Sequence, residues 1–276
     1  MNCNICKIGI TEPFYYQLND YRSNIEFSNV NDYYPLTWIK CLNCHSLTNL
    51  TSLKNINNLS KIYEFEYRSK LSKTEIYTKI DKILRLRNQT ESYKRSIKLK
   101  QIVLNEIDAD LPYVYDIGGG LGIDIYSLIK IGFNGTLYDI SKQSKISSRY
   151  LNINHIDNFE ELIININNNP NKNILITFNY ILEHILNPDI YIMDIISKIN
   201  IEKNIYVYIE IPNNKNITNI DGCLTMLIPE HIYLISVNGL LSLIDNNLVS
   251  INTHEIKTQR GHSSIVNFSK RRKLNV

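Results

Sequence analysis

Alanine is almost absent from this chain of 276 residues: Ala109 is the only one, beside 47 isoleucines and 37 asparagines. This skew runs through the whole sequence and is typical of codon bias toward A and T, so it indicates nothing about function. No apolar run approaches the roughly 20 residues that a membrane span requires, and the N-terminus has no basic segment followed by an apolar one. We therefore expect a soluble, cytoplasmic protein that has no membrane partner.

A strong charge of either sign is also missing. The 30 Lys and Arg residues nearly balance the 27 Asp and Glu residues, which leaves a net charge of +3. This charge is too small to indicate a nucleic-acid partner, and the short basic cluster 270–273 is typical of a solvated C-terminus. Hydrophobic residues make up 43% and charged residues 21% of the chain, so it can bury an ordinary globular core.

Only five cysteines are present, and four of them form two C-x-x-C pairs. In a reducing compartment, two such pairs favour a metal site over disulfides. Four thiolates can hold Zn²⁺ in a closed tetrahedral site, which has no open position for a substrate, so we expect a structural zinc. Two pairs of buried, unligated thiols are the alternative, and we expect Cys223 to be an inert small hydrophobe. The proposed zinc ligands are Cys3, Cys6, Cys41 and Cys44.

Three regions follow one another along the chain. Residues 1–50 carry both cysteine pairs and little helical periodicity, so they predict a small β-rich ribbon. Residues 51–111 form a linker in which apolar residues recur at steps of three and four between 73 and 107, the pattern of one or two amphipathic helices. Residues 112–276 form the main domain, and we expect its core to be separate from that of the ribbon.

The main domain alternates short apolar strands with helices, a pattern typical of a parallel sheet covered on both faces. We expect two further strands at the end to form an antiparallel pair at the sheet edge. The predicted strands are 113–117, 136–139, 152–156, 174–178, 205–211, 249–257 and 263–268. The predicted helices are 121–131, 142–150, 159–166, 188–199 and 237–246.

Four of the ten glycines fall within five residues, at 118, 119, 120 and 122, between the first predicted strand and the next helix. A glycine loop in this context lets a ligand approach the backbone and a helix N-terminus. The dinucleotide fingerprint G-x-G-x-x-G would require glycine at Ile123, so the spacing argues against that ligand. Asp116 could accept hydrogen bonds from a cationic amino-acid group, and Asp139, at the end of the next strand, could bind ribose hydroxyls.

This combination of a G-x-G-x-G loop and two acids resembles the S-adenosylmethionine (SAM) site of class I methyltransferases. Three later segments are also similar to one branch of that family: TFNYILEHILNPDIYI (177–192), IEIPN (209–213) and PEHIYLIS (229–236). The resemblance implies a Rossmann-like α/β fold with a seven-stranded, mostly parallel sheet, and SAM as the cofactor. It assigns cofactor binding to Asp116, Gly118, Gly120, Gly122, Asp139 and Asn179.

A cysteine ribbon, a helical linker and a class I domain together resemble the sugar C-methyltransferases and related methyltransferases of surface-polysaccharide genes. The resemblance implies C- or O-methylation of a small-molecule acceptor, a nucleotide-linked sugar or a polysaccharide unit. It places His184, Glu230 and His231 against the acceptor, with Tyr67 reaching it from the linker. The family's usual Y-H-E-H sequence is replaced here by Ile228, Pro229, Glu230 and His231.

Methyl transfer depends mainly on positioning, and a base is needed only to remove the acceptor's proton. We expect His231 to be that base, with His184 as the alternative. Either histidine could instead be structural, and Glu183 and His184 could cap a helix that begins near Pro188. Two other functions remain open. One is a nucleic-acid methyltransferase, although no N-P-P-Y sequence begins at Asn179, and the other is a non-catalytic SAM-binding scaffold. The sequence does not indicate an oligomeric state.

Overall fold

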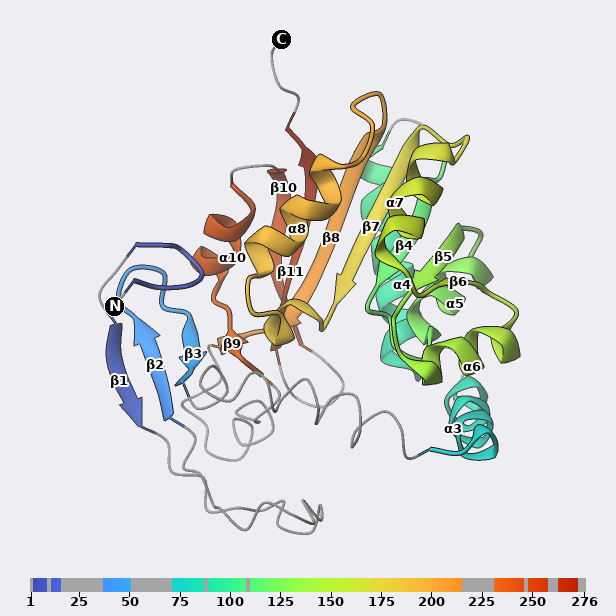
Figure 1. Cartoon of the computed structure of the whole chain (residues 1–276), viewed down its shortest axis with the longest axis horizontal. Helices are drawn as coiled ribbons and strands as arrows, with labels where there is room; N and C mark the ends of the chain where they lie inside the picture. The colour runs from blue at the N-terminus through green and yellow to red at the C-terminus, as the bar shows by residue number, and fades with distance from the viewer. Residues whose placement is uncertain are drawn as a thin grey trace.

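The computed structural model describes residues 2–8, 11–15, 37–50, 71–86, 89–107, 110–214, 231–245, 248–257 and 263–272. Tyr67, Glu230 and Cys223, which the sequence analysis considered, lie outside these residues. The described chain folds into two β-sheets with helices around the larger one (Figure 1).

The strands are β1 (Thr11–Tyr15), β2 (Thr37–Cys41), β3 (Leu47–Asn49), β4 (Tyr113–Ile117), β5 (Asn134–Tyr138), β6 (Asn154–Ile156), β7 (Asn173–Asn179), β8 (Asn204–Pro212), β9 (Tyr233–Leu234), β10 (Leu248–Lys257) and β11 (Ser263–Arg271). The helices are α3 (Lys73–Arg85), α4 (Glu91–Glu106), α5 (Ile123–Lys130), α6 (Lys142–Leu151), α7 (Phe159–Asn168), α8 (Pro188–Ser197), α10 (Val237–Ile244) and the short 3₁₀ turn η3 (Leu182–His184).

The larger sheet has seven strands in the order β10-β11-β8-β7-β4-β5-β6. Strands β8, β7, β4, β5 and β6 pair in parallel, and β11 runs antiparallel to both β8 and β10. The predicted α/β sheet and its antiparallel pair at the edge are therefore confirmed. The third predicted strand, 152–156, begins later, at Asn154. Helix α6 continues to Leu151 and ends at Asn152, whose φ of 54° provides a left-handed cap.

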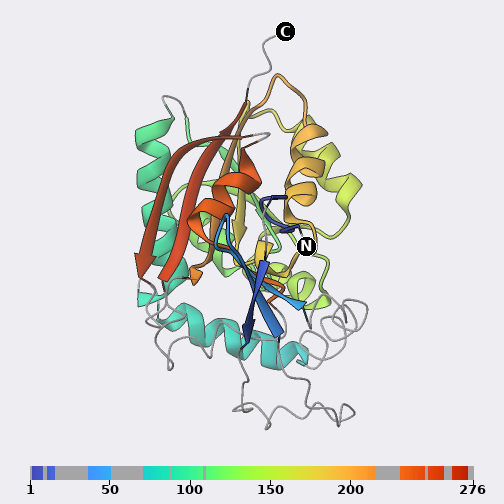
Figure 2. The same cartoon turned by 90° about the vertical axis from the view of Figure 1, so that its left-hand side faces the viewer.

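Alternate residues of the strands face the two covered sides of the sheet. Tyr115 and Ile117 of β4 pack in one apolar cluster with α7, α8 and α10, whereas Val114 belongs to a second cluster with α4 and α5. Figures 1 and 2 show these two helical layers on opposite faces. This arrangement explains why the central strands are apolar on both faces.

The predicted helical region between 73 and 107 consists of two helices. Helix α3 begins at a capping box, in which Ser72 and Glu75 each bind the other's backbone N–H, and α4 is capped by the Thr90 side chain. Helix α3 packs on α6, where the rings of Tyr77 and Tyr150 stack at a centroid distance of 4.1 Å. In the described part of the chain, no helix combines the length and the apolar character needed to cross a membrane.

The smaller sheet joins the cysteine ribbon to the main domain. Its order is β1-β2-β3-β9, so the last strand comes from a segment far along the chain, and Leu47 and Thr48 of β3 pair with Leu234 and Tyr233. Cys3, Cys41 and Cys44 belong to the same apolar cluster as residues of α8 and α10. The expectation of a separate ribbon core is therefore wrong, because β9 and α10 complete the packing of the ribbon.

Candidate functional site

The glycine loop lies at the carboxyl edge of the parallel sheet, between β4 and α5. Gly118, Gly120 and Gly122 all have positive φ values, of 69°, 56° and 73°. Side chains other than glycine rarely adopt this conformation, which explains the glycine spacing. A Cβ on Gly120 would meet no atom of the described residues within 4 Å. The loop therefore presents bare backbone to open space at the edge where open α/β folds bind ligands.

Asp139, which directly follows β5, is bound to the glycine loop. Its Oδ2 accepts a hydrogen bond from the backbone N–H of Gly120 at 2.9 Å, and its Oδ1 accepts one from Ser141 at 2.8 Å. The residue is 2% exposed. The two hydrogen bonds fix this carboxylate against the backbone of the glycine loop. The predicted contact between Asp139 and a ribose stays a prediction.

Asp116 lies beneath the loop and is completely buried. Its Oδ1 accepts hydrogen bonds from Thr177 at 2.6 Å and from the Asn179 side chain at 3.2 Å. Its Oδ2 has no hydrogen-bond partner among the described residues, and a Cβ on Gly119 would overlap it. Burial raises the pKa of Asp116 to about 7. Asp116 and Asn179 thus meet under the loop, and within the described part of the chain one carboxylate oxygen and the amide oxygen of Asn179 have no donor.

Glu183, His184 and His231 come together, and Ile181, which precedes the first two, lies beside Gly118 of the glycine loop. The ring centroids of the two histidines are 4.9 Å apart, and Nε2 of His184 lies 4.0 Å from Oε1 of Glu183. Glu183 is 1% exposed, and neither of its carboxylate oxygens accepts a hydrogen bond from a described residue. Burial raises its pKa to about 8. Glu183 does not cap α8, because that helix begins after Asn187 without a side-chain cap.

The ribbon holds the segment that carries His231. The side-chain amide of Asn49, at the end of β3, donates to the carbonyl oxygen of His231 at 3.3 Å, and its backbone N–H donates to Ile232 at 2.8 Å. The Ile232 N–H in turn donates to the carbonyl oxygen of Glu183 at 2.8 Å. Three separate segments are thereby fixed against one another around the two histidines.

A buried ion network, which the sequence analysis missed, lies beside this group. Arg95 of α4 binds Oε2 of Glu210 at the end of β8 and Oδ1 of Asp124 in the first turn of α5, each at 2.6 Å. The hydroxyls of Tyr180 and Tyr208 donate to the same glutamate at 3.0 and 2.9 Å. The one available signal was Glu210 itself, an acidic residue inside the apolar stretch IEIPN. The network ties α4 to the helix that follows the glycine loop.

The four ribbon cysteines form a single cluster. The Sγ atoms of Cys3 and Cys44 are 3.8 Å apart and those of Cys6 and Cys41 are 3.7 Å apart, and all four lie within 4.8 Å of one another. Zn–S bonds of about 2.3 Å in a tetrahedron separate the sulfurs by about 3.8 Å. A hydrogen bond from the Cys44 thiol lowers the pKa of Cys3 to about 5. The donor set fits a four-coordinate zinc ion.

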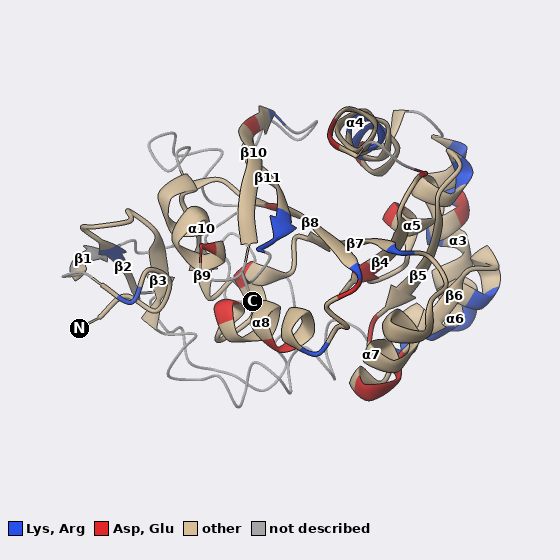
Figure 3. Ribbon diagram, turned by 90° about the horizontal axis from the view of Figure 1, so that it is seen from above, with Lys and Arg blue, Asp and Glu red and all other residues tan. Residues whose placement is uncertain are grey.

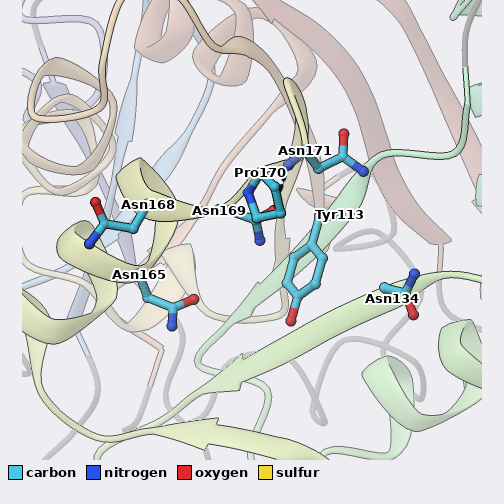
Figure 4. Close-up of a pocket in the computed structure, with 7 residues that line it drawn as sticks. All are labelled: Tyr113, Asn134, Asn165, Asn168, Asn169, Pro170 and Asn171. Atoms are coloured by element: carbon cyan, nitrogen blue, oxygen red, sulfur yellow. Dashed lines mark hydrogen bonds between the residues drawn. The ribbon is translucent and has the colours of Figure 1, made fainter.

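One hollow of about 480 Å³ lies elsewhere, at the amino edge of the sheet. Tyr113, at the start of β4, and a set of asparagines line it, as Figure 4 shows. None of the candidate cofactor, acceptor or metal residues is part of its lining. Because this hollow lies at the opposite edge of the sheet from the glycine loop, we assign it no part in the chemistry of the site.

Comparison with known proteins shows the fold. The chain is similar to the plantazolicin methyltransferase BamL, solved with a triazolic desmethylPZN analog and S-adenosylhomocysteine (SAH), with a TM-score of 0.55, 13% sequence identity and coverage of 81% of this chain and 98% of that one. It is also similar to the plantazolicin methyltransferase BpumL in complex with SAH, with a TM-score of 0.51, 14% identity and coverage of 80% and 100%. No family model and no curated protein matches the sequence. The chain has the Rossmann-like fold of the class I methyltransferases.

Proposed function

We propose that this protein is a SAM-dependent methyltransferase that acts on a small-molecule acceptor. The observation that carries the proposal is the loop of Gly118, Gly120 and Gly122, whose open backbone is bound to Asp139 at the carboxyl edge of a class I sheet. The positive φ values explain why these positions are glycine, and the open space beside Gly120 gives a ligand room to approach the backbone. Both structures compared above contain SAH.

The residues present fit this cofactor. Gly120 leaves room for a ligand against the backbone, and the Asp139 carboxylate is held at the same loop, where it could accept hydrogen bonds from ribose hydroxyls. Asp116 and Asn179 each have an oxygen under the same loop that no described residue binds, and these oxygens could accept hydrogen bonds from a cationic amino group. SAM supplies a methyl group on a sulfonium, which is already an excellent leaving group. The protein's contribution is therefore mainly to position the acceptor.

We propose a nucleotide-linked sugar or polysaccharide unit as the acceptor, on the sequence resemblance described above. His184 follows Ile181, whose side chain lies beside Gly118, and His231 lies against His184, so we propose that the acceptor approaches on this side. Glu230 adjoins His231 in the sequence, and Tyr67 would reach the acceptor from the linker. Figure 3 supports a small molecule over a nucleic acid: basic residues of α6 and acidic residues of α7 occur on the same side of the molecule.

We further propose that the cysteine cluster holds a structural zinc ion. Four thiolates close the coordination shell, so the metal would stabilise the ribbon and take no part in methyl transfer. The sulfur spacings support this assignment.

Calorimetry with SAM and SAH tests the proposed function. We expect the full chain to bind both, and we expect Asp139→Ala to lose about 1–3 kcal/mol of affinity, because ribose hydroxyls and the Gly120 N–H lose an acceptor. Asp157→Ala is the matched control, because that carboxylate follows the neighbouring strand and pairs with exposed Lys145. Absence of SAM and SAH binding would reject the proposal. Binding of SAH without turnover on any acceptor would instead favour the non-catalytic scaffold.

A further inference from the structure

Glu183, His184 and His231 form a second group of metal-ligating side chains, distinct from the cysteine cluster. One ligand atom from each of the three lies within 4.8 Å of the others. They come from two segments, η3 after β7 and the residues before β9, which the hydrogen bond from Ile232 to Glu183 holds together. Two imidazoles and one carboxylate are a common ligand set for divalent transition metals.

Glu183 is the independent observation that indicates a cation. Its side chain is 1% exposed and both oxygens lack a hydrogen-bond donor among the described residues. A buried carboxylate without partners is costly, and such groups in proteins are usually paired or bound to a metal. Nε2 of the adjacent His184 lies 4.0 Å from Oε1 of Glu183, which is too far for a hydrogen bond. A cation between the three side chains would supply the missing charge.

The three ligand atoms are slightly too far apart to hold a metal ion, and the side chains would have to move closer together to bind one. Metal–nitrogen and metal–oxygen bonds of about 2.0–2.2 Å place neighbouring ligand atoms roughly 3.0–3.5 Å apart. The 4.0 Å between His184 and Glu183 is therefore about 0.5–1 Å too long, and no pair of ligand atoms in the group is more than 4.8 Å apart, so binding requires the side chains to move closer by about 1–2 Å. Three protein ligands would leave coordination positions open, unlike the closed cysteine cluster.

We propose that Glu183, His184 and His231 bind a divalent transition-metal ion with open coordination positions at the carboxyl edge of the sheet. Its role rests on the proposed function: the ion would bind oxygen atoms of a hydroxyl-bearing acceptor and lower the pKa of the bound hydroxyl. The acceptor oxygen then bonds to the methyl carbon while the carbon–sulfur bond breaks, its electron pair stays on sulfur and the hydroxyl proton goes to water. The two histidines are ligands in this reaction, and neither has to act as the base.

Manganese binding tests the site directly, because Mn²⁺ prefers nitrogen and oxygen ligands to the ribbon thiolates. The full chain, with its zinc retained and weakly held metal removed by brief dialysis against a chelator, is titrated with Mn²⁺ while free Mn²⁺ is followed by electron paramagnetic resonance. We expect one bound Mn²⁺ per chain. Glu183→Gln and His231→Gln should each weaken binding at least about tenfold. His254→Gln, a histidine on β10 outside the group, should bind as the wild type does.

Thermal melting with and without Mn²⁺ separates lost ligands from lost folding. Mn²⁺ should raise the Tm of the wild type and of His254→Gln, and should leave that of a folded Glu183→Gln unchanged. The proposed metal site would be wrong if the wild-type protein bound no Mn²⁺ or if the variants bound it as well as the wild type. A histidine would then again be the candidate base that removes the acceptor's proton. SAM calorimetry on the same samples keeps the two proposals apart, since loss of cofactor binding rejects the methyltransferase and leaves a manganese site standing.

Discussion

Asn49 of the cysteine ribbon donates hydrogen bonds to two successive backbone carbonyls, those of His231 and Ile232. Its side chain donates to the carbonyl oxygen of His231 at 3.3 Å and its backbone N–H donates to that of Ile232 at 2.8 Å. Next to these hydrogen bonds, strand β3 of the ribbon pairs with β9. The ribbon is thus part of the scaffold that positions a candidate site residue, so its stability bears on the site.

Loss of the cysteine cluster should weaken the whole fold. Cys41→Ser removes one of four zinc ligands from a cluster that packs in the same core as α8 and α10. We expect zinc content to fall well below one per chain and the Tm of the main transition to fall by at least about 5 °C. Lys40→Ser, one residue earlier on β2, is the control. Metal analysis and circular dichroism melting check both, and an unchanged main transition would contradict the shared core.

Gly120→Ala should damage cofactor binding more than stability. The added Cβ meets no described atom, so the fold loses only the roughly 1–2 kcal/mol of a left-handed alanine, while the methyl group enters the space proposed for the ligand. We expect SAM affinity to fall at least tenfold in calorimetry. Gly132→Ala, also at positive φ and remote from the loop, should lose stability without losing affinity. Equal affinities for the two variants would show that the loop does not contact the cofactor.

Asp116 should make the cofactor-free protein less stable as the pH rises. Its pKa is raised to about 7 by burial, so between about pH 4 and pH 7 the unfolded chain releases a proton that the folded chain keeps. The unfolded state is therefore favoured progressively across this window. Asp116→Asn removes the effect, and urea unfolding at pH 4.5 and 7.5 should show a smaller loss of stability in the variant. Burial also raises the pKa of Glu183, so both the wild type and the variant lose some stability as the pH rises. An equal loss of stability in the two proteins would therefore contradict the burial of an ionisable Asp116.

Arg95→Met should destabilise the protein by about 3–5 kcal/mol, because it leaves Glu210 buried without its cation. Adding Glu210→Gln should recover part of this loss, since the amide removes the unpaired charge. Lys145→Met breaks an exposed ion pair with Asp157 and should cost less than about 1 kcal/mol. Chemical denaturation measures all three. A cost for Arg95→Met no larger than that for Lys145→Met would show that the network is not coupled to folding.

The larger sheet could be predicted because its strands are buried on both faces, which leaves short apolar runs such as ILITF in β7. The cysteine cluster followed from spacing alone, and the glycine loop from four glycines in five residues. The pairing of β3 with β9 could not be predicted, because a two-residue strand has no measurable periodicity and its partner is distant in the sequence. Arg95 was missed for a related reason: an arginine on an amphipathic helix has the pattern of a solvated residue, and only the folded chain brings Glu210 and Asp124 to it.

The late position of β9 has a consequence for biosynthesis. Strands β1, β2 and β3 and the four cysteines of the cluster leave the ribosome early, so the ribbon could bind the proposed metal while most of the main domain is still unmade. Until Tyr233 and Leu234 emerge, however, β3 presents an unpaired edge that could pair with another nascent chain. A chain truncated before Tyr233 would keep that edge open, and aggregation of such fragments would begin at the end of the molecule that was synthesised first.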